Sequence, residues 1–285
     1  MPNQIDYFDT PALALERDMT SGALSPILSG RAAIVTGGGK GIGRGISIRL
    51  AEAGARVVIV GHSNMQMAEE TCDIIRTRGG EAVCIGVDLA QRESAGQVIQ
   101  CALDHFGGID ILVNNAAFQP NLDIDEYPPD LFRTVINTNL IAYLRMTMGC
   151  FPYLKQSGHG RIVNLEPVHA KRPTGFDFGY ATSKGGLSQL TRETAVACIP
   201  YGMTCNAILP GGTMIEFKTV RPDLGVASYS PGRKVVRVER PRRFRLSHRV
   251  GKPADTANMT VFLCSDEAEH YNGVAIRADG GAMLV

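Results

Sequence analysis

Residues 31–45, RAAIVTGGGKGIGRG, are the stretch of the sequence that decides the fold. A short apolar run at 32–35 leads directly into a cluster of glycines. Beyond the glycines, apolar residues follow at a spacing compatible with a helix, at Ile42, Ile46, Ile48 and Leu50. The stretch therefore predicts a strand, a tight turn and a helix, which is the opening unit of a parallel α/β sheet.

The glycines of this turn have distinct expected roles. Gly37 allows a tight turn, Gly41 lets the backbone approach a bound phosphate closely, and Gly43 allows the helix to pack against the strand. The N–H groups and the positive dipole end at the start of the helix favour a pyrophosphate there. A glycine-rich turn is a weak signal by itself, and its position between a predicted strand and a predicted helix makes it a strong one.

Length, composition and charge indicate one large α/β domain with no global electrostatic partner. The chain has 285 residues, of which 44% are hydrophobic, and its 29 Lys and Arg against 28 Asp and Glu give a formal charge of +1. This balance predicts neither nucleic acid nor an anionic membrane as a partner. The first ten residues have no basic start and no apolar core, and no apolar run reaches membrane-spanning length, so we expect a cytoplasmic protein.

The cysteines and histidines point to no disulfide and no metal. Seven cysteines are scattered, odd in number and without a CxxC pair, which is typical of reduced thiols. The six histidines lack metal-ligand spacing. We therefore expect no metal site.

The order of the predicted elements indicates two unequal parts. Residues 1–29 contain several turn formers and are expected to form an arm over the domain or a neighbouring subunit, and residues 30–285 are expected to form one domain. After the first unit, short apolar runs typical of strands buried on both faces alternate with helical patterns. The predicted strands are 56–60, 82–87, 109–113, 161–165, 204–209 and 274–277, and the predicted helices are 65–78, 92–106, 130–156, 180–199 and 254–263. A loop-rich stretch covers about residues 210–250.

Several short motifs in this order together resemble the short-chain dehydrogenase/reductase family across about residues 30–282. The motifs are TGGGKGIG at 36–43, DL at 88–89, NNAA at 114–117, Asn139, YATSK at 180–184, NAILPG at 206–211 and DGG at 279–281. The region around Val168, His169 and the following helix is most similar to the glucose dehydrogenase and 3-oxoacyl reductase types. The resemblance implies a single Rossmann-type doubly wound domain with a seven-stranded parallel sheet, a nicotinamide dinucleotide, and hydride transfer between a carbonyl and an alcohol.

Tyr180 and Lys184 form the predicted catalytic pair. They are four residues apart on a predicted helix and therefore share one face. An ammonium beside a phenol favours the phenolate and lowers the tyrosine pKa, as a general acid/base for a carbonyl oxygen requires. A surface Tyr and Lys at helical spacing is the alternative, and the accompanying motifs favour the catalytic reading.

The resemblance assigns further residues to catalysis and to the cofactor. Asn139 matches the family's helix asparagine, which helps to hold a water for proton relay, although it could also satisfy a helix backbone. Asn114 matches a residue that braces the central strand, and Asp88 one that contacts the adenine end. The implied cofactor-binding residues are Gly37, Lys40, Gly41, Ile42, Gly43, His62, Ser63, Asp88, Leu89, Asn115, Ala116, Tyr180, Lys184, Pro210, Gly211 and Thr213.

The main departure from the family lies at Pro167. The family has a serine thirteen residues before the tyrosine that donates a hydrogen bond to the substrate oxygen, and Glu166 and Pro167 replace its usual pair of serines. Loss of one such donor typically costs roughly 100- to 1000-fold in rate. His169 is a possible replacement, as is Glu166 if protonated, although His169 is more simply a loop residue. A second departure is Ile215, where the family often has a threonine that contacts the cofactor, which leaves Thr213 as a nearby substitute.

The second strand carries the information on cofactor choice. NAD-selective members have an acidic residue at its end, and Gly61 stands there instead. Lys40 in the glycine-rich turn, together with His62, Ser63 and Asn64, would suit a 2′-phosphate, unless Lys40 simply points to solvent. NADP is therefore favoured, and NAD remains possible.

The resemblance implies that the loop-rich stretch over about 210–250 covers the substrate, and this substrate loop is strongly basic. Residues 221–249 contain nine Arg or Lys against Asp223 and Glu239, an excess of seven positive charges in 29 residues. Such a cover would steer an anionic substrate, and a solvated loop or an inter-subunit contact is an equal alternative. The resemblance also implies a homotetramer or homodimer. Apolar positions along the helix predicted over 130–156 fit burial in such an interface, or equally against the sheet, and they are Leu131, Val135, Leu140, Tyr143, Leu144 and Met148.

Two functions follow from these observations. The first is an NAD(P)-dependent oxidoreductase acting on a small-molecule carbonyl or alcohol, supported by Asn139, Tyr180 and Lys184. The alternative is a catalytically impaired dinucleotide-binding homologue with a regulatory or structural role, supported by Pro167 and Ile215.

Overall fold

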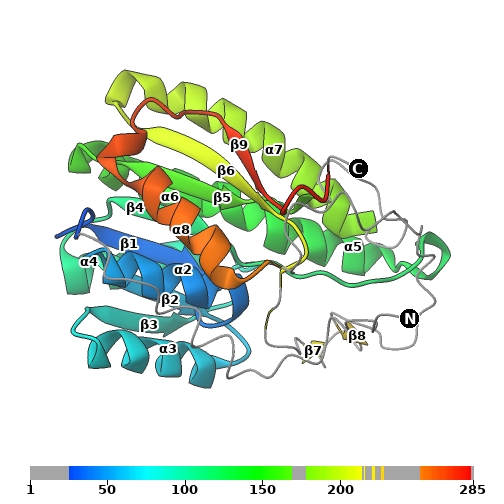
Figure 1. The fold of residues 1–285 in the computed structure, drawn as a ribbon. Helices are drawn as coiled ribbons and strands as arrows, with labels where there is room; N and C mark the ends of the chain where they lie inside the picture. Colours follow the sequence, from blue (N-terminus) through cyan, green and yellow to red (C-terminus); the bar gives the residue numbers. More distant parts are fainter. Residues whose placement is uncertain are drawn as a thin grey trace, which may run out of the picture.

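Seven short segments of the chain pair side by side into one parallel sheet in the order β3-β2-β1-β4-β5-β6-β9 (Figure 1). The computed structural model describes residues 26–168, 178–213, 215, 220–221, 226–227 and 251–283. The strands are β1 (Ala32–Thr36), β2 (Arg56–Gly61), β3 (Ala82–Gly86), β4 (Ile111–Asn114), β5 (Arg161–Leu165), β6 (Thr204–Pro210) and β9 (Ala275–Ala278). The predicted Rossmann-type sheet of seven parallel strands is confirmed.

The register of β1 fixes where the two halves of the sheet meet. Ile34 pairs with Val58 of β2 on one side and with Leu112 of β4 on the other. The strand order reverses at this point, because β2 and β3 extend in one direction from β1 while β4, β5, β6 and β9 extend in the other. In open α/β sheets, ligands bind outside the carboxyl ends of the strands at such a reversal.

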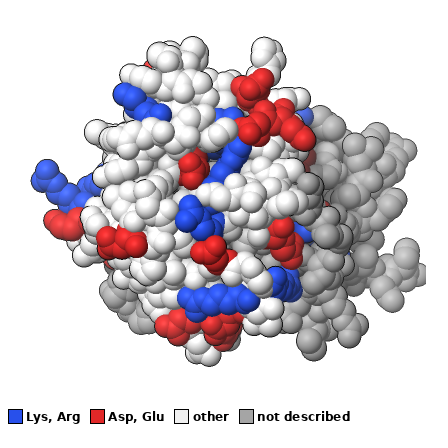
Figure 2. All heavy atoms as spheres, turned by 90° about the vertical axis from the view of Figure 1, so that its left-hand side faces the viewer, with Lys and Arg blue, Asp and Glu red and all other residues white. Residues whose placement is uncertain are grey.

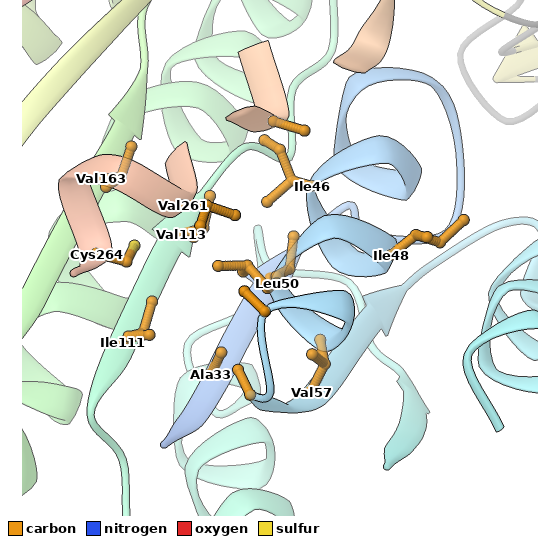
Figure 3. Packing of buried hydrophobic residues seen from close by; sticks show 14 of the residues in the cluster. Ala33, Ile46, Ile48, Leu50, Val57, Ile111, Val113, Val163, Val261 and Cys264 are labelled. Atoms are coloured by element: carbon orange, nitrogen blue, oxygen red, sulfur yellow. The ribbon is translucent and has the colours of Figure 1, made fainter. Parts of the chain in front are cut away.

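Helices cover both faces of the sheet because each central strand is apolar on both of its faces. Ala33 and Val35 of β1 belong to one hydrophobic core and Ile34 to the other. The first core lies under α2 (Gly41–Glu52), α3 (Met65–Thr77) and α8 (Pro253–Cys264), and the second lies under α4 (Ser94–Phe106), α6 (Ala142–Ser157) and α7 (Phe178–Cys198). Figure 3 shows Leu50 of α2 and Val261 of α8 converging in the first core.

The helix predicted over 130–156 is interrupted. It consists of α5 (Pro129–Ile136), a π-helical turn (Asn137–Ile141) and α6 (Ala142–Ser157). A π turn admits one extra residue into the helix, often at a functional site, and periodicity of apolar residues does not reveal it. This turn contains Asn139, one of the predicted catalytic residues.

Other boundaries differ from the predicted ones by small amounts. Helix α4 begins at Ser94 rather than at Arg92, and its Ser94 hydroxyl donates to the Asp88 carbonyl at 2.6 Å. Leu28, at the end of the predicted N-terminal arm, is fully buried in the first core and donates its N–H to the Ala53 carbonyl. Two short strands, β7 (Val220–Arg221) and β8 (Val226–Ala227), pair antiparallel within the loop-rich stretch.

At the face where the strands begin, charged side chains stabilise the fold. In Figure 2, which looks onto this side, Lys and Arg are interspersed with Asp and Glu, and no large region of one sign is visible. Arg31 and Arg161 both contact the Asp266 carboxylate, at 2.7 and 3.3 Å, and Arg31 also donates to the Cys264 carbonyl at the end of α8. These arginines hold the last turn of α8, where cations interact favourably with the helix dipole.

Candidate active site

The glycine-rich turn joins β1 to α2 at the carboxyl end of the sheet. Gly37 has φ +63° and Gly41 φ +53°, a left-handed conformation that side chains rarely adopt. At Gly43 a side chain would collide with the Gly37 carbonyl and the Asn115 amide, so only glycine lets the helix start this close to the turn. The close packing expected of Gly37 and Gly43 is thus present.

Asn115 ties the end of β4 to this turn. Its side-chain amide donates to the Thr36 and Gly37 carbonyls at 2.9 and 3.1 Å, and its own N–H donates to the Thr36 hydroxyl at 2.8 Å. Ala116 also donates its N–H to that hydroxyl. The two strands that flank the reversal of strand order are therefore joined by hydrogen bonds beside the glycine-rich turn.

The start of α2 fits a phosphate group. The N-cap residue Lys40 makes no side-chain hydrogen bond to the first turn, and no acidic residue lies in that turn. The first N–H groups of a helix have no partner inside the helix, so these groups and the helix dipole suit an anion. Burial lowers the pKa of Lys40. Gly37, Gly41, Ile42 and Gly43 would form the cradle for the pyrophosphate of a dinucleotide.

At the end of β2, a side chain in place of Gly61 would have to displace the Met65 side chain. A side chain at Gly61 would meet the Met65 sulfur at 2.7 Å. His62 and Ser63 are exposed beyond this point, and the side-chain amide oxygen of Asn64 caps α3 by accepting from the Met67 N–H. The side-chain oxygen of Asn64 is therefore occupied in capping, whereas His62 and Ser63 face solvent.

Asp88 and Leu89 follow β3 in a tight turn. The Asp88 carboxylate accepts from the Ala90 N–H at 3.0 Å, which holds the turn, and Leu89 is buried in the second core. This places both residues beyond the carboxyl end of β3, on the same edge of the sheet as the glycine-rich turn.

Tyr180 and Lys184 lie on one face of α7, and both are buried. The Lys184 Nζ is 5.9 Å from the centroid of the Tyr180 ring. It donates to the Tyr143 hydroxyl at 2.9 Å and to the Leu165 carbonyl at 2.8 Å. Burial lowers the pKa of Lys184 to about 7, against the opposing effect of the Glu166 charge, and burial also raises the pKa of Tyr143 well above its ordinary value.

Asn139 connects the loop after β4 to α7. Its amide pairs in both directions with the Phe118 backbone, since it accepts from the Phe118 N–H at 2.8 Å and donates to the Phe118 carbonyl at 2.9 Å. The same amide donates to the Ser183 hydroxyl, which in turn donates to the Tyr180 carbonyl. Asn139 thus holds the π turn, the loop after β4 and the Tyr180 turn of α7 together.

Glu166 does not occupy the position of a substrate donor. The side chain is fully buried, and its carboxylate accepts from Ser188 and Thr191 of α7, both at 2.7 Å. The suggestion that a protonated Glu166 donates to the substrate oxygen is therefore wrong, because both of its oxygens are bound inside the protein. Pro167 follows it directly and has no N–H to offer.

Three residues around Lys184 escaped the sequence-based prediction. Tyr143 was predicted only as an apolar position of a long helix, and Ser188 and Thr191 were not singled out. Their spacing carries a signal, since Tyr143 lies four residues after Asn139, and Ser188 and Thr191 lie four and seven after Lys184 on one side of a helix.

The segment after β6 passes close to the glycine-rich turn. The Gly211 N–H bonds to the Ala278 carbonyl, and the Thr213 hydroxyl donates to the Gly211 carbonyl at 3.1 Å. A side chain at Gly41 would meet the Ile215 side chain at 3.2 Å, so Ile215 covers this glycine. Pro210, Gly211 and Thr213 therefore lie on the same edge as the turn. His169 lies outside the described residues, as do the side chains of the basic stretch 221–249.

Comparison with known proteins identifies the family. A family model described as short chain dehydrogenase matches residues 31–222. The chain is 34% identical to an L-rhamnose 1-dehydrogenase (NAD(P)(+)) of Azotobacter vinelandii, in an alignment that covers 90% of this chain and 98% of the relative. It is 30% identical to glucose 1-dehydrogenase 2 of Bacillus subtilis, in an alignment that covers 90% of this chain and 96% of that relative. A crystal structure of a short chain dehydrogenase from Burkholderia cenocepacia in complex with NADP has a TM-score of 0.78 at 29% identity, covering 90% of this chain and 99% of the other.

The chain therefore belongs to the short-chain dehydrogenase family. It is an NAD(P)-dependent oxidoreductase of the class that acts on CH–OH groups. Within the described residues, no group of three or more metal-ligating side chains gathers. The described helices include none with the length and apolar character that crossing a bilayer requires.

Proposed function

We propose that the chain catalyses hydride transfer between nicotinamide and a carbonyl or secondary-alcohol substrate, with NADP as the preferred cofactor. The arrangement of Tyr180 and Lys184 carries this proposal, because a buried ammonium lies 5.9 Å from the ring of a tyrosine on the same helix face. A bound nicotinamide dinucleotide supplies the hydride in reduction and accepts it in oxidation. Tyr180 gives a proton to the carbonyl oxygen in reduction and removes it from the hydroxyl in oxidation, and the Lys184 ammonium stabilises the phenolate.

Residues around the glycine-rich turn are proposed to bind the dinucleotide. Gly37, Gly41, Ile42 and Gly43 would hold the pyrophosphate, and Asn115 and Ala116 would line the reversal of strand order. Asp88 and Leu89 would contact the adenine end. Pro210, Gly211 and Thr213 would line the nicotinamide end, with Tyr180 and Lys184 beside it.

The preference for NADP rests on charge and space at the end of β2. Gly61 provides no carboxylate to bind two ribose hydroxyls, and a side chain there would have to displace Met65. Lys40, His62 and Ser63 are a cation and two hydrogen-bonding groups suited to a 2′-phosphate. The solved relative from Burkholderia cenocepacia is a complex with NADP. Calorimetric titration with NADPH and NADH tests the preference, and equal affinities would contradict it.

A catalytically impaired homologue is the second candidate, and Pro167 is the observation that favours it. This position has no N–H, and the neighbouring Glu166 carboxylate is bound to Ser188 and Thr191. A screen of cofactor oxidation over ketones, keto acids and acyl-CoA compounds separates the two candidates. Binding of NADPH without turnover of any substrate, together with activity created by Pro167→Ser, supports the impaired homologue.

Further properties are proposed on the same basis. The excess positive charge of residues 221–249 suits an anionic substrate. The domain is proposed to span residues 30–285 with an N-terminal arm at 1–29, in a cytoplasmic protein.

A homotetramer or homodimer is proposed from the family and from exposed apolar side chains on α6 and α7. Met148 is 65% exposed and Val196 66% exposed. Three of the apolar positions predicted to lie in an interface or against the sheet, Leu131, Val135 and Tyr143, are buried within the chain. An interface would therefore use the Met148 side of the helix. Light scattering at micromolar concentration tests this, and a monomer mass would contradict it.

A further inference from the structure

The carboxylate of Glu166 is the end of a buried polar chain. The Asn114 amide donates to Asn164 at 2.9 Å, and the Asn164 amide donates to the Thr191 hydroxyl at 3.0 Å. Thr191 then donates to Glu166 at 2.7 Å. A second hydroxyl, that of Ser188, donates to the other oxygen of Glu166 at 2.7 Å. Two hydroxyl donors on the two oxygens suit an ionised carboxylate, which accepts hydrogen bonds and donates none.

This carboxylate lies beside the turn of α7 that contains Lys184. The residue preceding Glu166, Leu165, gives its carbonyl to the Lys184 Nζ at 2.8 Å. On the helix side, the Ser188 hydroxyl that binds Glu166 is also 3.5 Å from the Lys184 carbonyl. Glu166 and Lys184 are both buried, at 0% and 1% exposure. Burying an ammonium is costly unless a negative charge lies near it.

We propose that Glu166 is the internal counter-ion of Lys184, a positioning residue whose negative charge favours the protonated form of the buried lysine. The catalytic consequence rests on the proposed function, because a protonated Lys184 is what favours the Tyr180 phenolate. The charge coupling itself is a property of the folded chain. Glu166 contacts neither substrate nor cofactor in this proposal, and it acts through Lys184.

Two other titratable groups near this pair, Tyr143 and Cys205, do not supply the negative charge. Tyr143 from α6 and Tyr180 from α7 face Lys184, and Cys205 from β6 faces Glu166. Burial raises the pKa values of Tyr143 and Cys205 well above their ordinary values, so both are neutral at pH 7. The Glu166 charge raises the pKa of Lys184 against the larger opposing effect of burial. Among the described residues, Glu166 is therefore the anion that bears on Lys184.

The direct test is a titration of Lys184 by NMR on isotope-labelled lysine side chains, with the signal assigned by its loss in Lys184→Met. We expect Glu166→Gln to lower the pKa of Lys184 by roughly 1 to 3 units, and Glu166→Asp to keep it near the wild-type value. Glu193→Gln is the matched control, because Glu193 is an exposed carboxylate on the same helix, bound to Gln189. An unchanged Lys184 pKa in folded Glu166→Gln overturns the proposal.

If Glu166→Gln fails to fold, the reciprocal variant, Lys184→Met, tests the same charge coupling from the side of Glu166. In Lys184→Met the carboxylate loses its counter-ion, so Glu166 should take up a proton at neutral pH. The carbonyl-stretching band of a protonated carboxylic acid should then appear in the infrared spectrum of this variant and not in that of the wild type. Its absence from both overturns the proposal.

The pH–rate profile tests the catalytic consequence separately. In the alcohol-oxidation direction, the rising limb of Glu166→Gln should lie at higher pH than that of the wild type, because a neutral Lys184 no longer favours the phenolate. A shifted lysine pKa in a chain with no turnover would refute the proposed function and leave the counter-ion assignment in place. A shifted lysine pKa with an unmoved profile would refute the role of Glu166 in catalysis.

Discussion

The Lys184 Nζ donates a hydrogen bond to the Tyr143 hydroxyl at 2.9 Å, so the lysine of α7 that is proposed to act in catalysis is held by a second tyrosine, from α6. Tyr143 is 1% exposed and cannot exchange this partner for bulk water. We therefore propose different tasks for the two tyrosines of the candidate active site. Tyr180 is proposed to act on the substrate, and Tyr143 holds the Lys184 ammonium.

Tyr143→Phe should impair catalysis and stability together. A hydrogen bond to a charged group contributes about 1.5–3 kcal/mol. We therefore expect kcat to fall about tenfold and the free energy of unfolding to fall by about 1.5–3 kcal/mol. Steady-state kinetics and urea denaturation measure the two effects. Tyr201→Phe is the control, because this tyrosine is 44% exposed and lies away from Lys184. Equal kcat values for Tyr143→Phe and the wild type would contradict the role given to Tyr143.

The buried Lys184 should make stability depend on pH in a defined direction. Its pKa is lowered from 10.5 to about 7, so between these values the unfolded chain binds more protons than the folded one. Stability therefore rises with pH across this window, by up to about 1.4 kcal/mol per pH unit for one group. Urea denaturation at several pH values should show this rise in the wild type and a smaller one in Lys184→Met. If the free energy of unfolding depended on pH in the same way in both proteins, the pKa of Lys184 would not be lowered in the folded chain, which would contradict this prediction.

Lys40→Ala should narrow the preference for NADPH over NADH. A charge-assisted hydrogen bond to phosphate contributes about 1.5–3 kcal/mol, so the affinity ratio should shrink about tenfold or more, with NADH affinity nearly unchanged. Lys155→Ala is the control, since Lys155 packs over the Tyr201 ring at the end of α6. Calorimetry that finds the same ratio in Lys40→Ala and the wild type would remove the charge argument for NADP.

Paired replacement of Arg242 and Arg243 by Ala tests the anionic substrate. A steering charge contributes mainly to uniform binding, so KM should rise while kcat changes less. The penalty should shrink at high salt, because exposed charges are screened over about 8 Å at physiological ionic strength. An unchanged KM with a lower Tm or a smaller oligomer mass would assign these arginines to structure.

The sheet and the glycine-rich turn were predictable because local patterns determine them. Strands such as β1 are apolar on both faces and therefore appear as uninterrupted runs, and the apolar run at 32–35 matches β1 (Ala32–Thr36) to within one residue. The close packing of Gly43 on Gly37 was also predictable, because no other residue fits.

The surroundings of Lys184 were not predictable, because they depend on contacts between distant segments. Glu166 meets Thr191 across 25 positions of sequence, and Tyr143 meets Lys184 across 41. The pattern of apolar residues in the helix gave Tyr143 an apolar role, since a tyrosine has both an apolar ring and a polar hydroxyl. The π turn at Asn139 was missed for a similar reason, because one inserted residue barely alters helical periodicity.

The turnover of Tyr180→Phe, measured together with its affinity for NADPH, tests the central claim most directly. The Tyr180 hydroxyl is proposed to act on the substrate, and general acid/base catalysis typically contributes roughly 100- to 10,000-fold. We predict that kcat falls by at least that lower factor while the calorimetric Kd for NADPH stays within about twofold of the wild-type value. Retention of wild-type turnover by Tyr180→Phe would contradict the account, because the proton would then move through another group.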